Sequence, residues 1–111
     1  MDFKVVKSEP GLTQVALSGK LDVEGEAEIG DRFRDIVASR DTSFLVDMSS
    51  VTYLASLGIR LLFAGAKTLA GNGKKLVVLN PQPMVEETLL TSGTARLIAI
   101  AHSEEEALSL L

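Results

Sequence analysis

The most informative stretch of this sequence joins an apolar segment to an amphipathic one. It reads Asp47-Met48-Ser49-Ser50-Val51-Thr52-Tyr53-Leu54-Ala55-Ser56-Leu57-Gly58-Ile59-Arg60. The residues just before it, Phe44-Leu45-Val46, are continuous and apolar, which is typical of a strand covered on both faces. After it, apolar residues recur at helical spacing as far as Ala70. The stretch therefore predicts a strand that ends at Asp47, a polar-apolar connection, and a helix that begins at Ser56.

The flanking sequence continues this alternation of strand and helix patterns. The predicted elements are strands over 3–6 and 13–18, a helix over 23–40, a strand over 44–46, a helix over 56–70, a strand over 76–79, a short helix through Val85 and Leu89, a strand over 97–100, and a helix after Ser103. Pro10-Gly11 predicts a turn between the first two strands, which makes them an antiparallel hairpin. Gly71-Asn72-Gly73 ends the helix that begins at Ser56, and Ser103 with Glu106 predicts a capping box. A hairpin followed by alternating helices and strands predicts an α/β fold with a mixed, mostly parallel sheet and helices packed on it.

Composition excludes several classes of protein. The 111 residues suit one domain, which we expect over 1–111. No apolar run approaches the ~18 residues of a membrane helix and no secretion signal opens the chain, so we expect a cytoplasmic protein without membrane insertion. The chain has no cysteine and a single histidine, His102, so we expect no metal, no cofactor and no catalytic triad. A net charge of −4 without a basic stripe argues against direct nucleic-acid binding.

Two motifs resemble the signature of the STAS domain, the family of the anti-sigma factor antagonists. In that family a strand ending in Asp-x-Ser is followed by an aromatic residue and by a helix start of the form (Asp/Ser/Ala)-Ser-x-Gly. The corresponding residues here are Asp47-Met48-Ser49, Tyr53 and Ala55-Ser56-Leu57-Gly58. Gly19-Lys20-Leu21-Asp22, after the second predicted strand, is similar to the family's Gly-x-Leu-Asp motif. With the succession of elements, the resemblance covers essentially the whole chain.

The resemblance implies a bacterial regulatory protein that binds partners and has no enzymatic activity of its own. In many members an anti-sigma factor that is also a serine kinase phosphorylates one serine. The unphosphorylated form binds that kinase and releases its sigma factor, and a serine phosphatase resets the system. By position, Ser56 is the expected phosphoacceptor, Asp22 is expected beside it, and Gly58 is expected to allow close backbone approach. The expected partner-binding set is Asp22, Ser49, Ala55, Ser56, Leu57, Gly58 and Arg60.

The same residues also have structural interpretations. Ser56 is a favoured N-cap residue, and a cap is its alternative role. Asp22 is alternatively a cap or turn residue before the first helix. Ser49 and Ser50 are interpreted as turn residues, with a secondary phosphorylation site as the other possibility. Asp47 is expected to anchor the strand-end loop by hydrogen bonds to backbone N–H groups.

Some positions depart from the family pattern and keep a second function open. Sporulation-type members often carry Asp before the serine and Ser after it, where this chain has Ala55 and Leu57. Arg60 replaces a residue that is often small, and from one turn along the helix it can pair with a phosphate. The alternative is a STAS scaffold that is never phosphorylated, in a stress-signalling assembly or a membrane complex that transports lipids or anions. Nucleotide hydrolysis is disfavoured, because the chain lacks a P-loop and a metal cluster.

Overall fold

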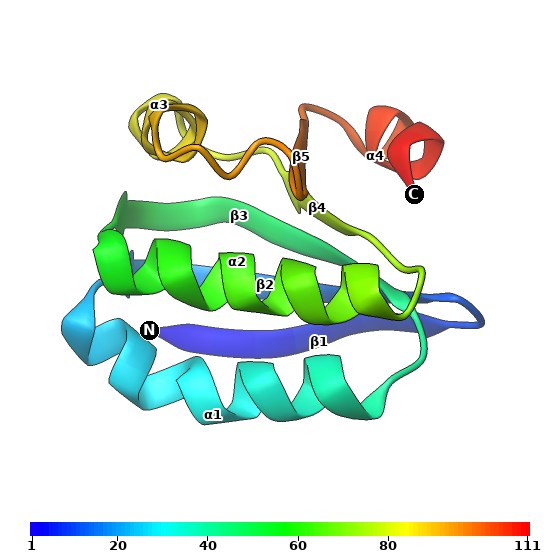
Figure 1. Ribbon diagram of the computed structural model, residues 1–111. Helices are drawn as coiled ribbons and strands as arrows, with labels where there is room; N and C mark the ends of the chain where they lie inside the picture. Colours follow the sequence, from blue (N-terminus) through cyan, green and yellow to red (C-terminus); the bar gives the residue numbers. More distant parts are fainter.

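One five-stranded sheet carries all four helices of the chain (Figure 1). The computed structural model describes residues 1–111. Its elements are β1 (Asp2–Glu9), β2 (Leu12–Leu21), α1 (Val23–Ser39), β3 (Ser43–Leu54), α2 (Ser56–Gly71), β4 (Leu76–Leu79), α3 (Pro83–Thr91), β5 (Ile98–Ala101) and α4 (Glu104–Leu110). The strand order is β1-β2-β3-β4-β5, with β1 antiparallel to β2 and every other pair parallel. The predicted N-terminal hairpin and mostly parallel sheet are confirmed.

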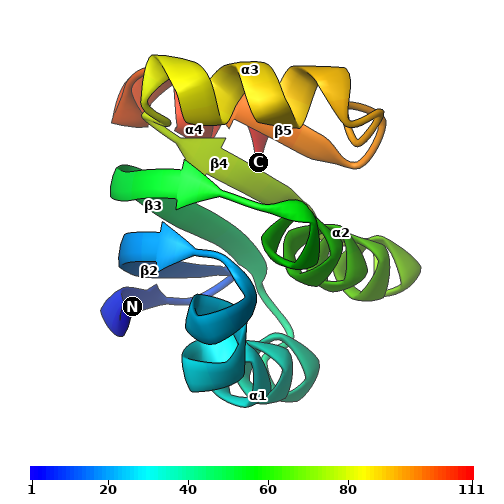
Figure 2. The same ribbon diagram turned by 90° about the vertical axis from the view of Figure 1, so that its left-hand side faces the viewer.

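The helices cover the two faces of the sheet unequally. Figures 1 and 2 show α1 and α2 side by side on one face, and Figure 1 shows α3 and α4 on opposite sides of β5. The larger core cluster lies under α1 and α2 and includes the fully buried Phe33 and Phe44. A smaller cluster on the other face joins Leu45 to Ala107 of α4. Because Phe44 and Leu45 point to opposite faces, this part of β3 is covered on both sides, as its apolar run predicts.

The prediction that the third strand ends at Asp47 is wrong, because β3 continues to Leu54. Only Phe44–Asp47 of β3 pairs with β4, whereas the second half pairs with the end of β2, from Ser18↔Ser50 to Leu21↔Leu54. Val51 and Leu54 in this half are buried in the main core, which stabilises it as a strand. The predicted turn at Ser49 and Ser50 is wrong for the same reason. Exposed hydroxyl residues give this half of β3 the composition of a loop, but pairing with β2 decides its conformation.

The predicted ends of the other elements agree more closely. Gly11 has φ +83° in the hairpin turn and Gly73 has φ +72° after α2, and both values favour glycine. The capping box is confirmed in one half, since the Glu106 N–H donates to Ser103 Oγ at 3.1 Å. In the other half, Glu106 Oε1 accepts from the backbone N–H of His102 at 2.6 Å rather than from Ser103. None of the helices is long and apolar enough to cross a membrane.

Candidate functional site

Two strand-to-helix junctions lie side by side at one edge of the sheet. Leu21 at the end of β2 pairs with Leu54 at the end of β3, and each strand is followed by one residue and then a helix. The backbone N–H of Ala55 donates to the carbonyl of Leu21 at 3.0 Å, which joins the two junctions directly. The starts of α1 and α2, and with them Asp22 and Ser56, are therefore neighbours. The adjacency follows from the parallel register of β2 and β3.

Ser56 is the first residue of α2, and its side chain is exposed. Ala55 holds the N-cap position and supplies no side-chain hydrogen bond to the helix. The interpretation of Ser56 as an N-cap is therefore wrong, and its hydroxyl has no hydrogen-bond partner in the protein. The first intrahelical bond runs from the Ile59 N–H to the Ala55 carbonyl at 3.0 Å. The N–H groups of the three residues before Ile59 precede the helical ladder, as at any helix start.

Asp22 occupies the N-cap of α1 at the neighbouring junction. Its Oδ1 accepts a hydrogen bond from the backbone N–H of Gly25 at 2.9 Å, so its structural role as a cap is confirmed. Glu24 and Glu26 lie in the first turn of the same helix. Three carboxylates therefore gather at the start of α1, where the helix dipole favours negative charge. The edge beside Ser56 is acidic on this side.

Gly58 brings the first turn of α2 against the end of β2. A Cβ atom at this position would lie 2.6 Å from Leu21 Cγ and 2.7 Å from the Leu21 carbonyl oxygen. Both separations are shorter than any real contact of a Cβ atom, so a side chain here would displace the helix. The expected close approach at Gly58 is confirmed, and the approaching residue is Leu21 of the same domain.

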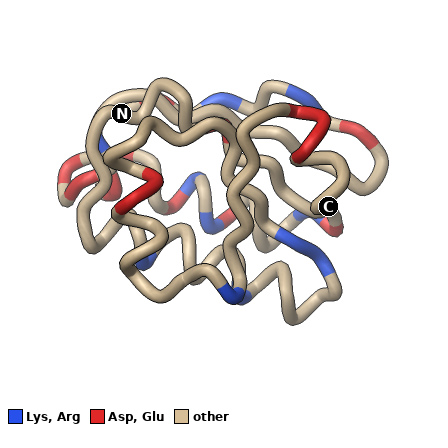
Figure 3. The backbone as a smooth tube through the Cα atoms, turned by 90° about the horizontal axis from the view of Figure 1, so that it is seen from above, with Lys and Arg blue, Asp and Glu red and all other residues tan.

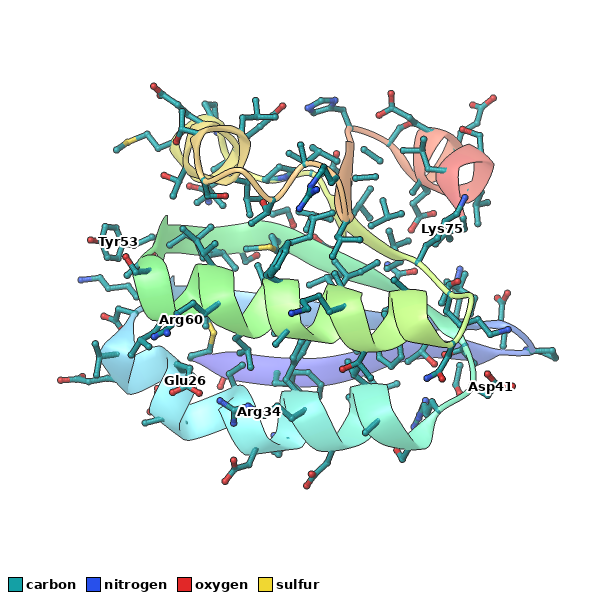
Figure 4. All side chains as sticks on the ribbon, viewed as in Figure 1. Glu26, Arg34, Asp41, Tyr53, Arg60 and Lys75 are labelled. Atoms are coloured by element: carbon teal, nitrogen blue, oxygen red, sulfur yellow. The ribbon has the colours of Figure 1, made fainter.

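Arg60 lies one turn after Ser56, on the same side of the helix, and is exposed without an ion-pair partner. It lines a cleft of about 370 Å³ together with Leu57, Glu26 and Arg34. Figure 4 shows Arg60 on α2 and Glu26 and Arg34 on the neighbouring α1. Arg34 is already engaged there, by Glu26 and by Asp31. Arg60 is therefore the cation of this cleft that remains available to an added anion.

Ser49 lies away from this group, so the structure divides the predicted partner-binding set. The chain between Ser49 and Leu54 is extended, and at about 3.3 Å per residue this separates Ser49 from the junction by roughly 16 Å. The Ser49 N–H donates to Asp47 Oδ1 at 2.9 Å, and its carbonyl accepts from Gln82 Nε2 at 3.0 Å. The anchoring role of Asp47 is confirmed, but inside a strand rather than in a loop. This bond lies at an irregularity where β3 has one more residue than β2.

The sequence analysis did not predict that three apolar residues are exposed at this edge. Val23 at the start of α1 is 64% exposed, Tyr53 near the end of β3 is 53% exposed, and Met84 at the start of α3 is 78% exposed. Figure 4 shows Tyr53 at the same end of the molecule as Arg60. The sequence carries a signal for each of them, since Val23 and Met84 stand at predicted helix starts and Tyr53 is the aromatic residue of the family motif. Their exposure depends on where the sheet places those ends.

Comparisons with known proteins agree on the family and the fold. A family model described as "Mlab, STAS domain" matches residues 5–99. The anti-sigma-F factor antagonist RsfB of Mycobacterium tuberculosis is 26% identical over 73 residues, which are 66% of this chain and 60% of the relative. The chain therefore spans less than two thirds of the length of these curated relatives.

Solved structures resemble the chain along nearly its whole length. The anti-sigma factor antagonist SpoIIAA in its unphosphorylated form matches with a TM-score of 0.79 and 18% identity, over 98% of this chain and 96% of the other. An anti-sigma factor antagonist from Mycobacterium paratuberculosis matches with a TM-score of 0.81 and 20% identity, over 98% and 93%. Part of the murine anion transporter Slc26a9 matches with a TM-score of 0.71 and 14% identity, over 90% of this chain and 17% of that protein. At these identities the likeness shows the fold.

Proposed function

Because the chain belongs to the STAS domain family, we propose that it is an anti-sigma factor antagonist whose partner binding is switched off by phosphorylation of Ser56. The unphosphorylated form binds a cytoplasmic anti-sigma factor with serine kinase activity, and the sigma factor is released. A serine phosphatase returns the modified protein to the binding state. The chain itself performs no catalysis in this scheme.

The observation that carries the proposal is the position of the Ser56 hydroxyl. It lies exposed at the first position of α2, with no hydrogen bond to the protein. A kinase therefore reaches it without unfolding the helix or breaking a cap. If Ser56 were the N-cap, phosphorylation of its oxygen would break the capping hydrogen bond, and the helix would lose about 1 kcal/mol of stability.

A phosphate at Ser56 fits the local electrostatics of α2. It adds about −1.5 to −2 charges at a helix start, where free N–H groups and the helix dipole favour an anion. Arg60, one turn away and unpaired, offers a second stabilising contact. No acidic residue lies in the first turn of α2. We therefore expect the modified domain to keep its fold.

The same phosphate opposes binding of the partner. Val23 and Tyr53 are exposed apolar residues at this edge, and Leu57 is half-buried beside Ser56. A partner that covers them would have to remove the phosphate from water, which is costly for a charged group without a buried counter-ion. Asp22 and its neighbouring carboxylates add negative charge to the same edge. Phosphorylation thus converts an apolar contact surface into an anionic one.

The test is intact-mass analysis after incubation of the full chain with candidate anti-sigma kinases and ATP. We expect one added phosphoryl group, lost in Ser56→Ala and retained in Ser49→Ala. Ser49 is a matched control, because it is an exposed serine that precedes the same helix but lies away from the junction. Modification that depends on Ser49 would instead assign the switch to β3.

Binding is measured separately, by titration of the purified kinase with each variant. We expect Ser56→Ala to bind as the wild type does and Ser56→Asp to bind at least about tenfold more weakly, since every tenfold is about 1.4 kcal/mol. Undiminished binding of Ser56→Asp would contradict the charge mechanism.

A second candidate function rests on the apolar residues that flank Ser56. Ala55 and Leu57 offer a kinase no polar groups next to the serine. They favour a STAS subunit that is not phosphorylated, in a stress-signalling scaffold or a membrane complex that transports lipids or anions. Stable co-purification with a permease or ATPase subunit, without any phosphoryl gain, would support this function.

A further inference from the structure

A cavity lies at the opposite edge of the sheet from Ser56. Its volume is about 520 Å³, and it opens where the chain enters β4 and β5. Because these strands run parallel to β3, their first residues lie at the other edge from the carboxyl end of β3. α2 connects the two places: Ser56 begins the helix, while Ala66 and Ala70 near its end line the cavity. The proposed phosphorylation switch does not use this cavity.

The walls of the cavity are mostly apolar. Eight of its twelve lining residues are hydrophobic. Leu97 and Ala99 are partly exposed and form part of the wall, and Leu110 of α4 closes one side. Val77 lies fully buried beneath them. The volume falls within the roughly 300–1,000 Å³ typical of small-molecule sites. An apolar body of modest length therefore has both space and surface to bury here.

The mouth of the cavity is positively charged. Lys74, Lys75 and Arg96 line it, and no Asp or Glu does. Lys74 has one distant partner, Asp41 at 3.9 Å, while Lys75 and Arg96 are exposed and form no ion pair. The chain as a whole carries a charge of −4, and its Lys and Arg residues are scattered among Asp and Glu (Figure 3). The local charge is thus opposite in sign to that of the protein.

Two of these cations stand on fixed backbone. The Lys75 N–H donates to Ser43 Oγ at 3.1 Å, and its carbonyl accepts from the Phe44 N–H at 2.9 Å. Arg96 lies in a turn closed by bonds from two following N–H groups to the Thr94 carbonyl, each 3.0 Å long. Figure 4 shows Lys75 at the opposite end of the molecule from Arg60. The backbone positions from which both side chains extend are therefore fixed at the mouth.

From these observations we propose that the cavity binds a free amphiphilic carboxylate, a single alkyl chain that ends in one carboxyl group. The alkyl chain lies against the partly exposed apolar residues of the cavity, Leu97, Ala99 and Leu110. The carboxylate lies at the mouth, where Lys75 donates as a point charge and Arg96 offers a planar, bidentate donor pair. Because this site and Ser56 occupy opposite ends of α2, both can be occupied in one molecule.

The test is a titration of the isotopically labelled full chain, followed by amide chemical shifts. Three probes are compared. Octanoate has both an alkyl chain and a carboxylate, 1-octanol has the alkyl chain without the carboxylate, and acetate has the carboxylate without the long chain. We expect octanoate to cause saturable shifts at the starts of β4 and β5, with at least about tenfold weaker binding of either other probe. Equal binding of octanol would contradict the role of the cations. Shifts centred on the start of α2 would overturn the proposed location.

Variants separate the site from a general effect of charge. We expect Lys75→Gln/Arg96→Gln to weaken octanoate binding at least about tenfold, because two charge-assisted contacts are lost. Lys7→Gln on β1 is the matched control and should bind as the wild type does. Ala70→Trp should block the cavity from the exposed side of α2, with folding checked by circular dichroism. Unchanged affinity in both cavity variants would overturn the proposal.

A membrane surface is the competing source of anionic groups joined to alkyl chains. Sedimentation with phosphatidylglycerol vesicles distinguishes it from a free ligand. We expect no sedimentation of the wild-type chain with these vesicles. Sedimentation that Lys75→Gln/Arg96→Gln abolishes, without saturable octanoate binding, would replace the ligand site by a membrane-contact surface. Either result leaves the phosphorylation of Ser56 as a separate question.

Discussion

The first turn of α2 places two residues with opposite requirements next to each other. Gly58 is buried, and its lack of a side chain allows the helix to lie against Leu21. Ser56, two residues earlier, is exposed and its hydroxyl is not used by the fold. Substitutions at these positions should therefore affect different properties: stability at Gly58 and partner binding at Ser56.

Gly58→Ala should lower the free energy of unfolding by about 1–3 kcal/mol, the usual cost of forcing atoms into a packed site. The added Cβ would lie 2.6 Å from Leu21 Cγ. Urea denaturation measures the change. Gly71→Ala is the matched control, because it lies at the other end of the same helix with nothing within 4 Å of its Cβ. The control should be neutral or stabilising by up to about 1 kcal/mol, and an equal loss in both variants would contradict the packing argument.

Arg60→Gln should raise the second pKa of a phosphate on Ser56. That pKa is about 6 for an ordinary phosphoserine, and a guanidinium nearby lowers it by favouring the dianion. Phosphorus NMR of the phosphorylated chain over a pH series gives the value directly. Lys67→Gln removes a cation from the same helix beyond the reach of Ser56 and should leave the pKa unchanged. Equal pKa values in the wild type and Arg60→Gln would show that the two groups do not pair.

At the scale of elements, α3 is held to its neighbours by two polar contacts. Gln82, just before the helix, donates to the Ser49 carbonyl of β3. Glu86 in its first turn meets the ring of His102, whose Nε2 lies 2.9 and 3.0 Å from the two carboxylate oxygens. His102 lies in the connection between β5 and α4. The pair therefore joins α3 to that connection. His102 is exposed.

Stability should depend on pH through this pair. The hydrogen bond to Glu86, followed by its charge and that of Glu106, raises the pKa of His102 above its ordinary 6.5. The folded state therefore binds the proton more tightly than the unfolded state does. The contribution is complete below pH 6.5 and is lost as the pH rises through the raised pKa.

Glu86→Gln tests this dependence. It should lower the pKa of His102 in an NMR titration, and it should reduce the free energy of unfolding more below pH 6.5 than at alkaline pH. Glu87→Gln is the matched control, because the exposed Glu87 makes no contact with the ring. A His102 pKa that does not respond to Glu86→Gln would contradict the assignment.

At the scale of the whole molecule, α2 separates two edges of the sheet with different chemistry. At about 1.5 Å per residue, its 16 residues span roughly 24 Å, and Ala70 at the cavity lies about 21 Å along the helix from Ser56. The edge at Ser56 carries exposed apolar residues and carboxylates, and the other edge carries an apolar cavity with cations at its mouth. Because the packed core lies between the two edges, we expect a change in charge at one edge to leave the structure of the other unchanged.

Ser56→Asp should therefore alter the molecule only locally. We expect amide shift changes at the starts of α1 and α2, and a melting temperature within a few degrees of the wild type, because no core contact or cap is lost. Heteronuclear NMR and thermal unfolding measure both. Changes that extend into β4, β5 and α4 would indicate a conformational switch instead of a change in surface charge.

Local patterns were sufficient for most elements of this chain. Helical periodicity predicted α1 over 23–40 and α2 over 56–70, within one residue of their observed ends. Glycines at 11 and 73 ended elements where the backbone needs a positive φ. The Gly-x-Leu-Asp motif and the helix start Ala55-Ser56-Leu57-Gly58 pointed to the junction at which Asp22 caps α1 and Ser56 begins α2. Each of these signals depends on residues within a few positions of one another, so these features can be predicted from the sequence alone.

The tertiary structure decided the features that depend on distant residues. β3 continues to Leu54 because β2 is long enough to pair with it, and no local pattern in Ser49-Ser50 reveals that partner. Ala55, rather than Ser56, became the cap because strand pairing sets where the extended chain turns into helix. The sequence by itself determined the order of elements, the family motifs and the serine at a helix start. Only the pairing of β2 with β3 placed Asp22 beside that serine and left its hydroxyl exposed, since hydrogen bonds between strands join residues that are far apart in the chain.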